Sequence, residues 1–212
     1  MKRIVIMVAG LLVSLVGISQ STQSLLESGT QYLEKNQLKE AQEMFNQVLE
    51  KDSKNVQAYY LRGNVKQRFE DLHGAMKDYN MAIELNPKLA DAYYQRGNLK
   101  FILQDYYGSI ADFSSTLALN ENHVEALLKR GQARQQLESY QDAINDFTKI
   151  IEINPKSIDA YFLRGILRIE YGQLESGCLD LSKAGELGDI KAYDVIKERC
   201  NTRVLSDTNI KE

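Results

Sequence analysis

The stretch Val56–Lys66 reads V-Q-A-Y-Y-L-R-G-N-V-K, and the pattern returns one repeat later, from Ala90, as A-D-A-Y-Y-Q-R-G-N-L-K. It returns again at the same interval from Val124 as V-E-A-L-L-K-R-G and from Ile158 as I-D-A-Y-F-L-R-G. A degenerate copy opens at Thr22. A fixed period of about 34 residues predicts stacked helical hairpins, in which each repeat packs only on its neighbours.

Composition and charge argue against several classes of function. The 212 residues carry 26 basic and 29 acidic side chains, so the chain lacks the basic surplus typical of nucleic-acid-binding proteins. His73 and His123 are the only histidines, and no glycine-rich phosphate loop or metal-spaced histidine pair is present. We therefore expect no catalytic residue, no metal site, no cofactor and no small-molecule substrate.

The period divides residues 20–191 into an array of five repeats. Their bounds are 22–55, 56–89, 90–123, 124–157 and 158–191. Residues 192–200 are expected to form a capping helix, because an array must cover its last apolar face. Residues 201–212 are polar and are expected to form a flexible tail.

Small residues recur inside the predicted first helices, where a glycine costs about 1 kcal/mol relative to alanine. The five equivalent glycines are Gly29, Gly63, Gly97, Gly131 and Gly165. Large side chains such as Tyr79, Phe113 and Phe147 recur in the second helices. We interpret the glycines as positions where the second helix of a hairpin approaches the first closely.

The array resembles the tetratricopeptide repeat family over about residues 22–191. In the second repeat the positions of the family pattern hold Tyr59, Arg62-Gly63, Lys66, Ala75, Tyr79, Ala82 and Pro87. Two departures recur: arginine replaces the usual leucine before glycine, and Lys66, Lys100, Arg134 or Arg168 replaces the usual tyrosine. The resemblance implies an all-α, right-handed α-solenoid of five helix-turn-helix repeats with a C-terminal capping helix.

The first residues match a secretory signal peptide over residues 1–19. Lys2 and Arg3 precede an apolar run from Ile4 to Ile18, and small residues occupy positions 17 and 19. We expect cleavage before Gln20 and an exported protein, either periplasmic or secreted. The alternative is a retained membrane anchor, although the run is shorter than the ~20 apolar residues that a span needs.

Four arginines each precede an aspartate by the same interval along the chain. The pairs are Arg62–Asp78, Arg96–Asp112, Arg130–Asp146 and Arg164–Asp180. The midpoint of each interval falls at the predicted hairpin turn, so antiparallel helices would place the partners face to face. The first repeat lacks both members and has Ser28 and Met44 instead. This joint loss favours a structural ion pair over the alternative, a basic ladder for a polyanion.

The two cysteines, Cys178 and Cys200, are equidistant from Asp189 in a predicted turn. Antiparallel helices around that turn would bring the two thiols together, and an exported protein can keep a disulfide. We predict a Cys178–Cys200 disulfide; the alternative is two separate buried thiols.

The first helices have a second face, which repeats at i, i+3, i+7 and i+10. In the resembled family this stripe lines the concave groove that holds peptides. The candidate partner-binding residues are Tyr60, Asn64, Tyr94, Asn98, Phe101, Gln132 and Phe162. Tyrosine offers rigid contact area and amides can pair with a peptide backbone. In the alternative, the aromatic rings only pack between adjacent first helices.

The sequence thus predicts a non-enzymatic scaffold or adaptor of the cell envelope that binds a partner protein or peptide segment. We expect no nucleic-acid partner and no stable membrane insertion after signal cleavage. The alternative function is a structural subunit of a permanent envelope or secretion assembly, without an exchangeable ligand. An obligate assembly favours a large apolar surface, whereas the predicted groove mixes aromatic and amide side chains.

Overall fold

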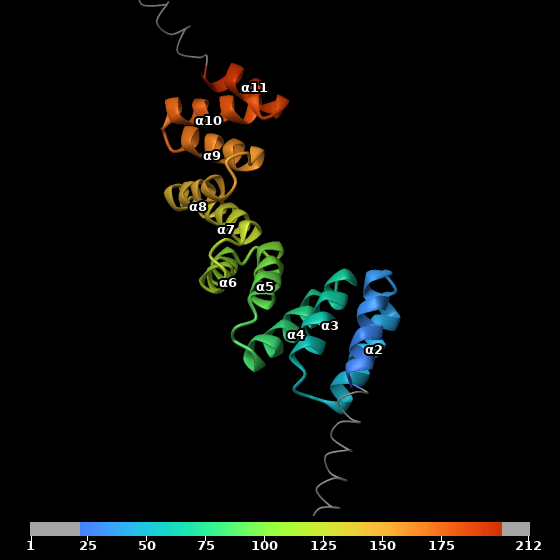
Figure 1. Ribbon diagram of the computed structural model, residues 1–212. Coiled ribbons are helices and arrows are strands. Elements are labelled where there is room, and N and C mark those ends of the chain that lie inside the picture. Colours follow the sequence, from blue (N-terminus) through green and yellow to red (C-terminus); the bar gives the residue numbers. More distant parts are fainter. Residues whose placement is uncertain (1–21, 201–212) are drawn as a thin grey trace, which may run out of the picture. The chain divides into compact units, whose positions relative to one another are not determined.

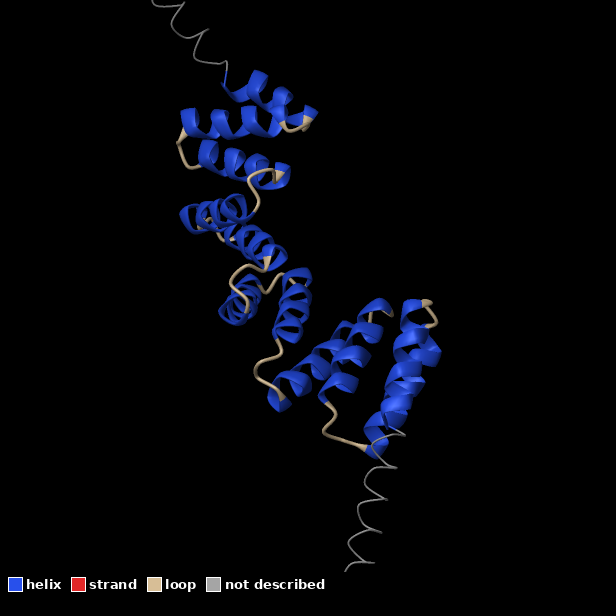
Figure 2. Cartoon of the chain, viewed as in Figure 1, coloured by secondary structure: helices blue, strands red, loops and turns tan. Residues whose placement is uncertain are grey.

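A computed structural model describes residues 22–200, which form helices joined by short turns (Figures 1 and 2). No strand occurs within this range, so the all-α prediction is confirmed there. The predicted signal peptide, residues 1–19, and the predicted tail, residues 201–212, lie outside the described residues. No helix between residues 22 and 200 is both long enough and apolar enough to cross a membrane.

The helices follow one another in pairs along the chain. After a helix over residues 22–34 they are α2 Leu38–Lys51, α3 Val56–Arg68, α4 Leu72–Leu85, α5 Ala90–Ile102, α6 Tyr106–Leu119, α7 Val124–Gln136, α8 Tyr140–Ile153, α9 Ile158–Glu170, α10 Leu174–Glu186 and α11 Ile190–Val195. A π-helical turn, η1 Ile196–Cys200, follows α11. The last helix begins two residues before the predicted cap, because the Asp189 side chain accepts a hydrogen bond from the Lys191 backbone N–H at 3.0 Å.

The chain divides into two compact units, one ending at Leu99 and the other beginning at Lys100. The boundary falls inside α5.

Polar side chains set where several helices begin. The Asn55 side chain accepts a hydrogen bond from the Ala58 N–H at 2.9 Å, at the start of α3. Asp71 accepts from the Gly74 N–H in the same way at the start of α4. Such N-caps satisfy backbone donors that a helix start leaves unpaired. The helix starts therefore follow from local sequence as well as from packing.

The turn inside each hairpin contains one residue in the left-handed conformation, again with the period of the repeat. These residues are Asn36, Glu70, Gln104, Glu138 and Gly172, with φ of 57°, 62°, 62°, 57° and 86°. Only the fifth is a glycine, the residue that adopts this conformation without a steric cost. Asparagine also visits this conformation readily, whereas Glu70, Gln104 and Glu138 adopt it at a steric cost.

In the first unit the glycines lie directly under large rings. A Cβ atom added to Gly29 would stand 2.6 Å from Phe45 Cε1, and one added to Gly63 would stand 2.6 Å from Tyr79 Cε1. Phe45 and Tyr79 are completely buried. The interpretation of these glycines as close-approach positions is confirmed.

The second unit repeats the arrangement with changes near its end. A Cβ on Gly131 would stand 2.7 Å from Phe147 Cε1, and one on Gly165 would stand 2.9 Å from Leu181 Cγ. Leu181 joins Ala184 and Ala192 in a buried cluster that α9, α10 and α11 share. The short α11 thus covers the apolar side of the last hairpin.

Candidate functional site

Each hairpin with the arginine motif buries one carboxylate beside cationic side chains. In the second repeat, Asp78 is only 3% exposed. The Arg62 guanidinium donates from Nε to Asp78 Oδ2 at 2.9 Å and from Nη2 to Oδ1 at 2.7 Å. Lys66 Nζ lies 2.8 Å from Oδ2 of the same carboxylate. The lysine that departs from the family pattern is therefore the second cation of this site.

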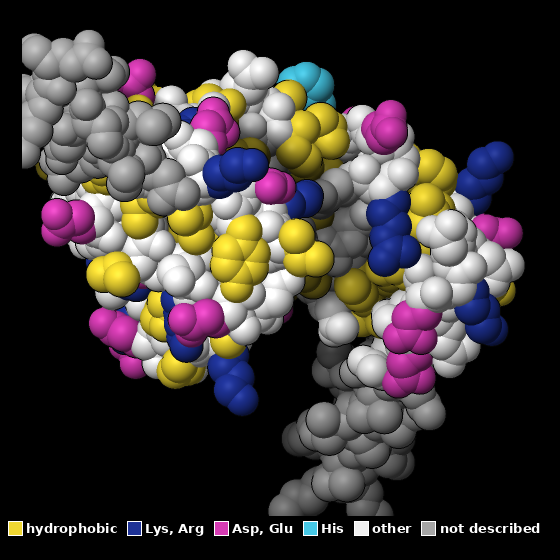
Figure 3. Space-filling view, turned by 90° about the horizontal axis from the view of Figure 1, so that it is seen from above, with side chains coloured by type: hydrophobic (Ala, Val, Ile, Leu, Met, Phe, Trp, Pro, Cys, Tyr) yellow, Lys and Arg dark blue, Asp and Glu magenta, His cyan; other side chains and the backbone are white. Residues whose placement is uncertain are grey.

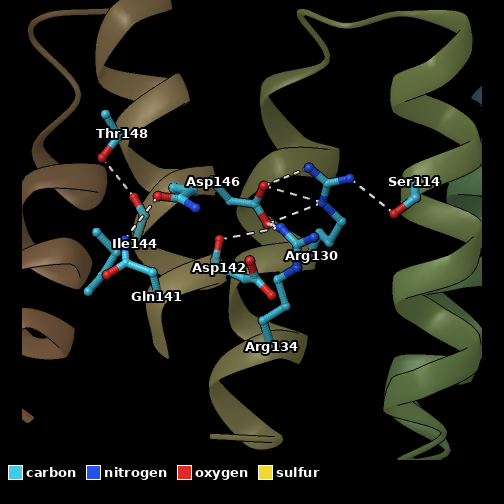
Figure 4. Close-up of polar contacts among 9 residues, drawn as sticks. Ser114, Arg130, Arg134, Gln141, Asp142, Ile144, Asp146 and Thr148 are labelled. Atoms are coloured by element: carbon cyan, nitrogen blue, oxygen red, sulfur yellow. Dashed lines mark hydrogen bonds and ion pairs between the residues drawn. The ribbon is translucent and has the colours of Figure 1, made fainter. Parts of the chain in front are cut away.

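The fourth repeat has the same arrangement. Figure 4 shows Arg130 and Arg134 converging on Asp146 from α7. Arg130 Nη2 lies 2.7 Å from Asp146 Oδ1, and Arg134 Nη1 lies 2.6 Å from Oδ2. An arginine here takes the place that Lys66 has in the second repeat.

In the fifth repeat Arg164 Nη2 lies 2.8 Å from Asp180 Oδ1, and Arg168 Nη1 lies 2.7 Å from Oδ2. The structure thus brings together three of the four predicted pairs. In the third repeat Lys100 Nζ lies 2.8 Å from Asp112 Oδ2. Arg96 belongs to the other unit, and its predicted pairing with Asp112 stays a prediction.

Each arginine also reaches back to the second helix of the preceding repeat. The Nη1 acceptors are Asn46 Oδ1 for Arg62 at 2.9 Å, Asn80 Oδ1 for Arg96 at 2.7 Å, Ser114 Oγ for Arg130 at 3.0 Å and Thr148 Oγ1 for Arg164 at 3.0 Å. One guanidinium therefore links two successive repeats. These acceptors were not predicted from the sequence, although they too recur with the period of the repeat.

The arginines are used internally, which favours the structural interpretation over a polyanion-binding ladder. Arg62, for example, donates from Nε, Nη1 and Nη2 and also lies over the Tyr59 ring, 5.5 Å from its centroid. Acidic and basic side chains alternate with hydrophobic ones on the face seen in Figure 3, which shows no large field of one sign.

The predicted binding residues of the first unit lie half-buried on α3 and α5. Tyr60 packs beside Tyr79, with 6.2 Å between ring centroids. The Tyr79 hydroxyl lies 2.8 Å from both Asn64 Oδ1 and Gln67 Oε1. Tyr94 and Asn98 are half-buried as well. Part of this stripe is therefore supported from beneath by a core tyrosine.

The Tyr79 hydroxyl keeps its hydrogen over the whole neutral range. Burial is the main cause that raises the pKa of Tyr79 above its usual value, and the charges of Tyr60 and Asp78 raise it further. A phenol in this state can donate as well as accept a hydrogen bond.

The predicted residues of the second unit differ in their surroundings. The Phe101 ring meets Tyr106 edge to face, with 5.5 Å between centroids, and Lys129 Nζ lies 5.4 Å from its centroid. Gln132 is half-buried on α7. Phe162 packs against the Leu181 cluster. Part of this ring therefore serves packing between helices, as the alternative interpretation of the aromatic rings expects.

A hollow of about 300 Å³ opens in the first unit beside the stripe. One face of the helix over residues 22–34 forms most of its wall, and Gln57 of α3 completes it. The lining is Gln23, Leu26, Glu27, Thr30, Gln31, Glu34 and Gln57. Gln57 could be placed on the second face of α3 from the sequence, but the hollow next to it was not predicted.

The structure joins Cys178 of α10 to Cys200 at the end of η1, with the two Sγ atoms 2.02 Å apart. The bond would fasten the end of η1 to α10. Within residues 22–200 no cluster of histidine, cysteine or acidic side chains could hold a metal ion.

These features define a class: an α-helical repeat protein whose hairpins are closed by glycine contacts and buried ion pairs, and whose successive repeats are linked by arginine hydrogen bonds. Three models of the tetratricopeptide repeat match the chain, over residues 23–55, 70–102 and 124–157. The chain belongs to the tetratricopeptide repeat family. Proteins with this fold generally act as non-catalytic interaction scaffolds.

Solved structures support the α-solenoid fold class. A MamA protein matches with a TM-score of 0.75 at 23% identity, covering 82% of this chain and 96% of its own. YrrB, described as a TPR protein with an unusual peptide-binding site, matches with a TM-score of 0.74 at 23% identity, covering 82% and 90%. A tetratricopeptide repeat protein from Parabacteroides merdae ATCC 43184 matches with a TM-score of 0.73 at 26% identity, covering 89% and 77%. No curated protein matches the sequence.

Proposed function

We propose that the protein is a non-enzymatic adaptor that binds an extended or helical segment of a partner protein on the stripe of its first helices. One observation carries the proposal. The stripe side chains stay half-exposed, whereas the arginines and aspartates of the motif in the second, fourth and fifth repeats are bonded to one another. The surface left for a partner is therefore aromatic and amide in character.

The chemistry of this surface sets expectations for the complex. Aromatic anchors such as Tyr60 and Tyr94 would supply most of the binding energy, since a few such residues dominate an interface. Amides such as Asn64 and Asn98 would orient the backbone of the partner. Because these contacts are neutral, the affinity should depend only weakly on salt, unlike that of a groove built on lysine and arginine.

The test begins with crosslinking in cells and identification of the attached protein, followed by binding measurements with purified components. We expect Tyr94→Ala and Asn98→Ala to weaken binding of the recovered partner while their melting temperatures stay near wild type. Tyr107→Ala is the matched control, because Tyr107 lies on α6, outside the stripe, and is 77% exposed. Normal binding by both stripe variants would assign the function to another surface.

The cellular place of this adaptor is part of the proposal: export to the cell envelope. The support is the sequence of residues 1–19, with its basic start and apolar run. Mass spectrometry of the protein from an envelope fraction should find a chain that begins at Gln20. An intact Met1 end would instead mean a retained anchor.

Exposed apolar side chains favour a second candidate, a permanent structural subunit. Leu179 of α10 and Ile190 of α11 are 71% and 79% exposed, and Tyr193, also on α11, is exposed as well. Light scattering after size-exclusion chromatography separates the two functions. A monomer at micromolar concentration favours the adaptor, and a stable oligomer favours the subunit.

A further inference from the structure

One hydroxyl in the second repeat faces two side-chain amides. Tyr79 comes from α4 and is completely buried, and its hydroxyl lies 2.8 Å from Asn64 Oδ1 and 2.8 Å from Gln67 Oε1, both on α3. A phenol carries a single hydrogen and can also accept a hydrogen bond. It therefore donates to one amide oxygen only, and the second oxygen would face it without a hydrogen between them.

Both hydrogen bonds of the Tyr79 hydroxyl can form when one of the two side-chain amides is rotated by 180°, so that its oxygen and nitrogen change places. Oxygen and nitrogen of a side-chain amide are assigned from the hydrogen-bond network, because their shapes are nearly the same. With one amide turned, the hydroxyl donates to a carbonyl oxygen on one side and accepts from an NH₂ group on the other. Tyr79 thus fixes the opposite polarity of Asn64 and Gln67.

This arrangement determines which hydrogen-bonding group, a donor or an acceptor, each of the two amides presents to a ligand. The amide that accepts from Tyr79 keeps its NH₂ free, and the amide that donates keeps its carbonyl oxygen free. Neither side chain has another hydrogen bond within residues 22–200. Neither outer atom is fully buried, because the only fully buried side-chain polar atom without a partner in that range is Arg168 Nε.

We propose that Asn64 and Gln67 form a preset donor–acceptor pair that reads the backbone of one residue in an extended peptide segment, with Tyr79 as the positioning residue. The N–H and C=O groups of one residue in a strand point to the same side. Side chains three apart on a helix lie about 5–6 Å apart, a separation that suits such a pair. This inference rests on the proposed function and names the chemistry of its ligand: a segment with a free, extended backbone.

The reading site is confined to the second repeat. Phenylalanine stands at the equivalent position in three other repeats, as Phe45, Phe113 and Phe147, and leucine in the fifth, as Leu181. None of these has a hydroxyl that could fix an amide above it. The register of a bound segment would therefore be set at α3.

The test uses peptide probes and a variant that the chain itself suggests. Dodecamers are selected from a random library on the full-length protein, and those whose binding weakens with Tyr94→Ala are kept. In each probe every backbone amide is replaced in turn by an ester, which removes one N–H group. We expect one ester position to lower the affinity for wild type about fivefold, the effect of one hydrogen bond.

The variant Tyr79→Phe should abolish the sensitivity to that ester while leaving the fold intact, because phenylalanine occupies this position in neighbouring repeats. Tyr107→Phe, which removes an exposed hydroxyl outside the stripe, should keep it. Gln67→Ala and Asn64→Ala repeat the test at the surface, and at least one of them should lose the ester effect. Gln67→Ala and Asn64→Ala keep the inference testable even if Tyr79→Phe does not fold.

The outcomes separate this inference from the proposed function. Ester sensitivity that persists in Tyr79→Phe and in both alanine variants overturns the reading pair and leaves the adaptor function standing. Probes that bind through Tyr94 but show no ester effect on wild type do the same. A library that yields no probe dependent on Tyr94 overturns both.

Discussion

The first and fifth hairpins solve the same packing problem with different side chains. Both place a glycine of the first helix under a large residue of the second, Phe45 over Gly29 in one and Leu181 over Gly165 in the other. The fifth hairpin adds a buried carboxylate, Asp180, held by two arginines, whereas the first has no charge at the equivalent positions. The comparison teaches that the glycine contact closes a hairpin and that the ionic group is an addition to it.

The largest effect should come from removing the buried carboxylate alone. Asp180→Ala leaves Arg164 and Arg168 without their anion, and breaking a buried ion pair in this way costs about 3–5 kcal/mol. Urea denaturation of the variant, followed by circular dichroism, measures the loss.

A matched variant replaces the ionic group of the fifth hairpin by the residues that the first hairpin has at the equivalent positions. There Ser28, Tyr32 and Met44 stand where the fifth hairpin has Arg164, Arg168 and Asp180. The triple change to serine, tyrosine and methionine should recover most of the stability, because replacing a complete ionic group is far milder than breaking it. A triple variant as unstable as Asp180→Ala would show that the two hairpins are not interchangeable.

The second effect concerns the covalent bond that only the fifth hairpin has. Replacing both Cys178 and Cys200 by serine should destabilise the last repeat and cap by about 3 kcal/mol, since the two cysteines are separated by 22 positions and the bond closes the loop between them. Hydrogen exchange of α11 and η1 should accelerate while exchange in α3 stays unchanged. A thiol assay on non-reduced protein checks the bond itself, and two free thiols would contradict it.

The third effect should be equal in both parts of the chain. Gly29→Ala and Gly131→Ala each place a methyl group within 2.7 Å of a buried ring, so each should lose about 2 kcal/mol through overpacking. Thermal melts compare them with Gln136→Ala, an exposed position on α7 that should change little. A much smaller loss at Gly29 would mean that the hairpin without charges is more loosely packed.

The smallest effect on stability is expected at the left-handed turn residues, where the fifth hairpin has a glycine and the fourth has a glutamate. Gly172→Ala in the fifth hairpin should cost about 1 kcal/mol, because an alanine is strained at φ of 86° although the space around it is empty. The opposite change in the fourth hairpin, Glu138→Gly, relieves that strain and should cost nothing or stabilise slightly. Chemical denaturation of both variants measures the difference in sign, and a clear loss in Glu138→Gly would argue against strain at this turn.

Much of the architecture could be predicted because the repeat multiplies each weak signal. The partners Arg62 and Asp78, for instance, followed from a constant spacing centred on a turn. The backward partners, such as Asn46, could not be predicted on the same grounds, because asparagine, serine and threonine are ordinary residues on a helix surface. The signal that could have indicated them is the recurrence of a small polar side chain at this position with the period of the repeat.

The candidate site was less predictable than the fold. The sequence predicts Tyr79 as a large core residue, but nothing in its position indicates that its hydroxyl reaches Asn64 and Gln67. In the sequence Lys66 stands out only as a departure from the family pattern, because the spacing pairs its anion, Asp78, with Arg62. In both cases a third side chain contacts two others, and the spacing between two residues in the sequence does not reveal a contact of this kind.

The arginine bridges have a consequence for how the array can grow and shrink. Arg62 and Arg130 each take one partner from the preceding repeat and another from their own hairpin, at equal distances along the chain, and both partners recur with the period of the repeat. Duplicating or deleting one whole repeat therefore presents every arginine at the new junction with an equivalent set of acceptors. A change of copy number leaves no ion orphaned, whereas inserting a single residue in a connecting turn shifts an arginine away from its acceptor in the neighbouring repeat.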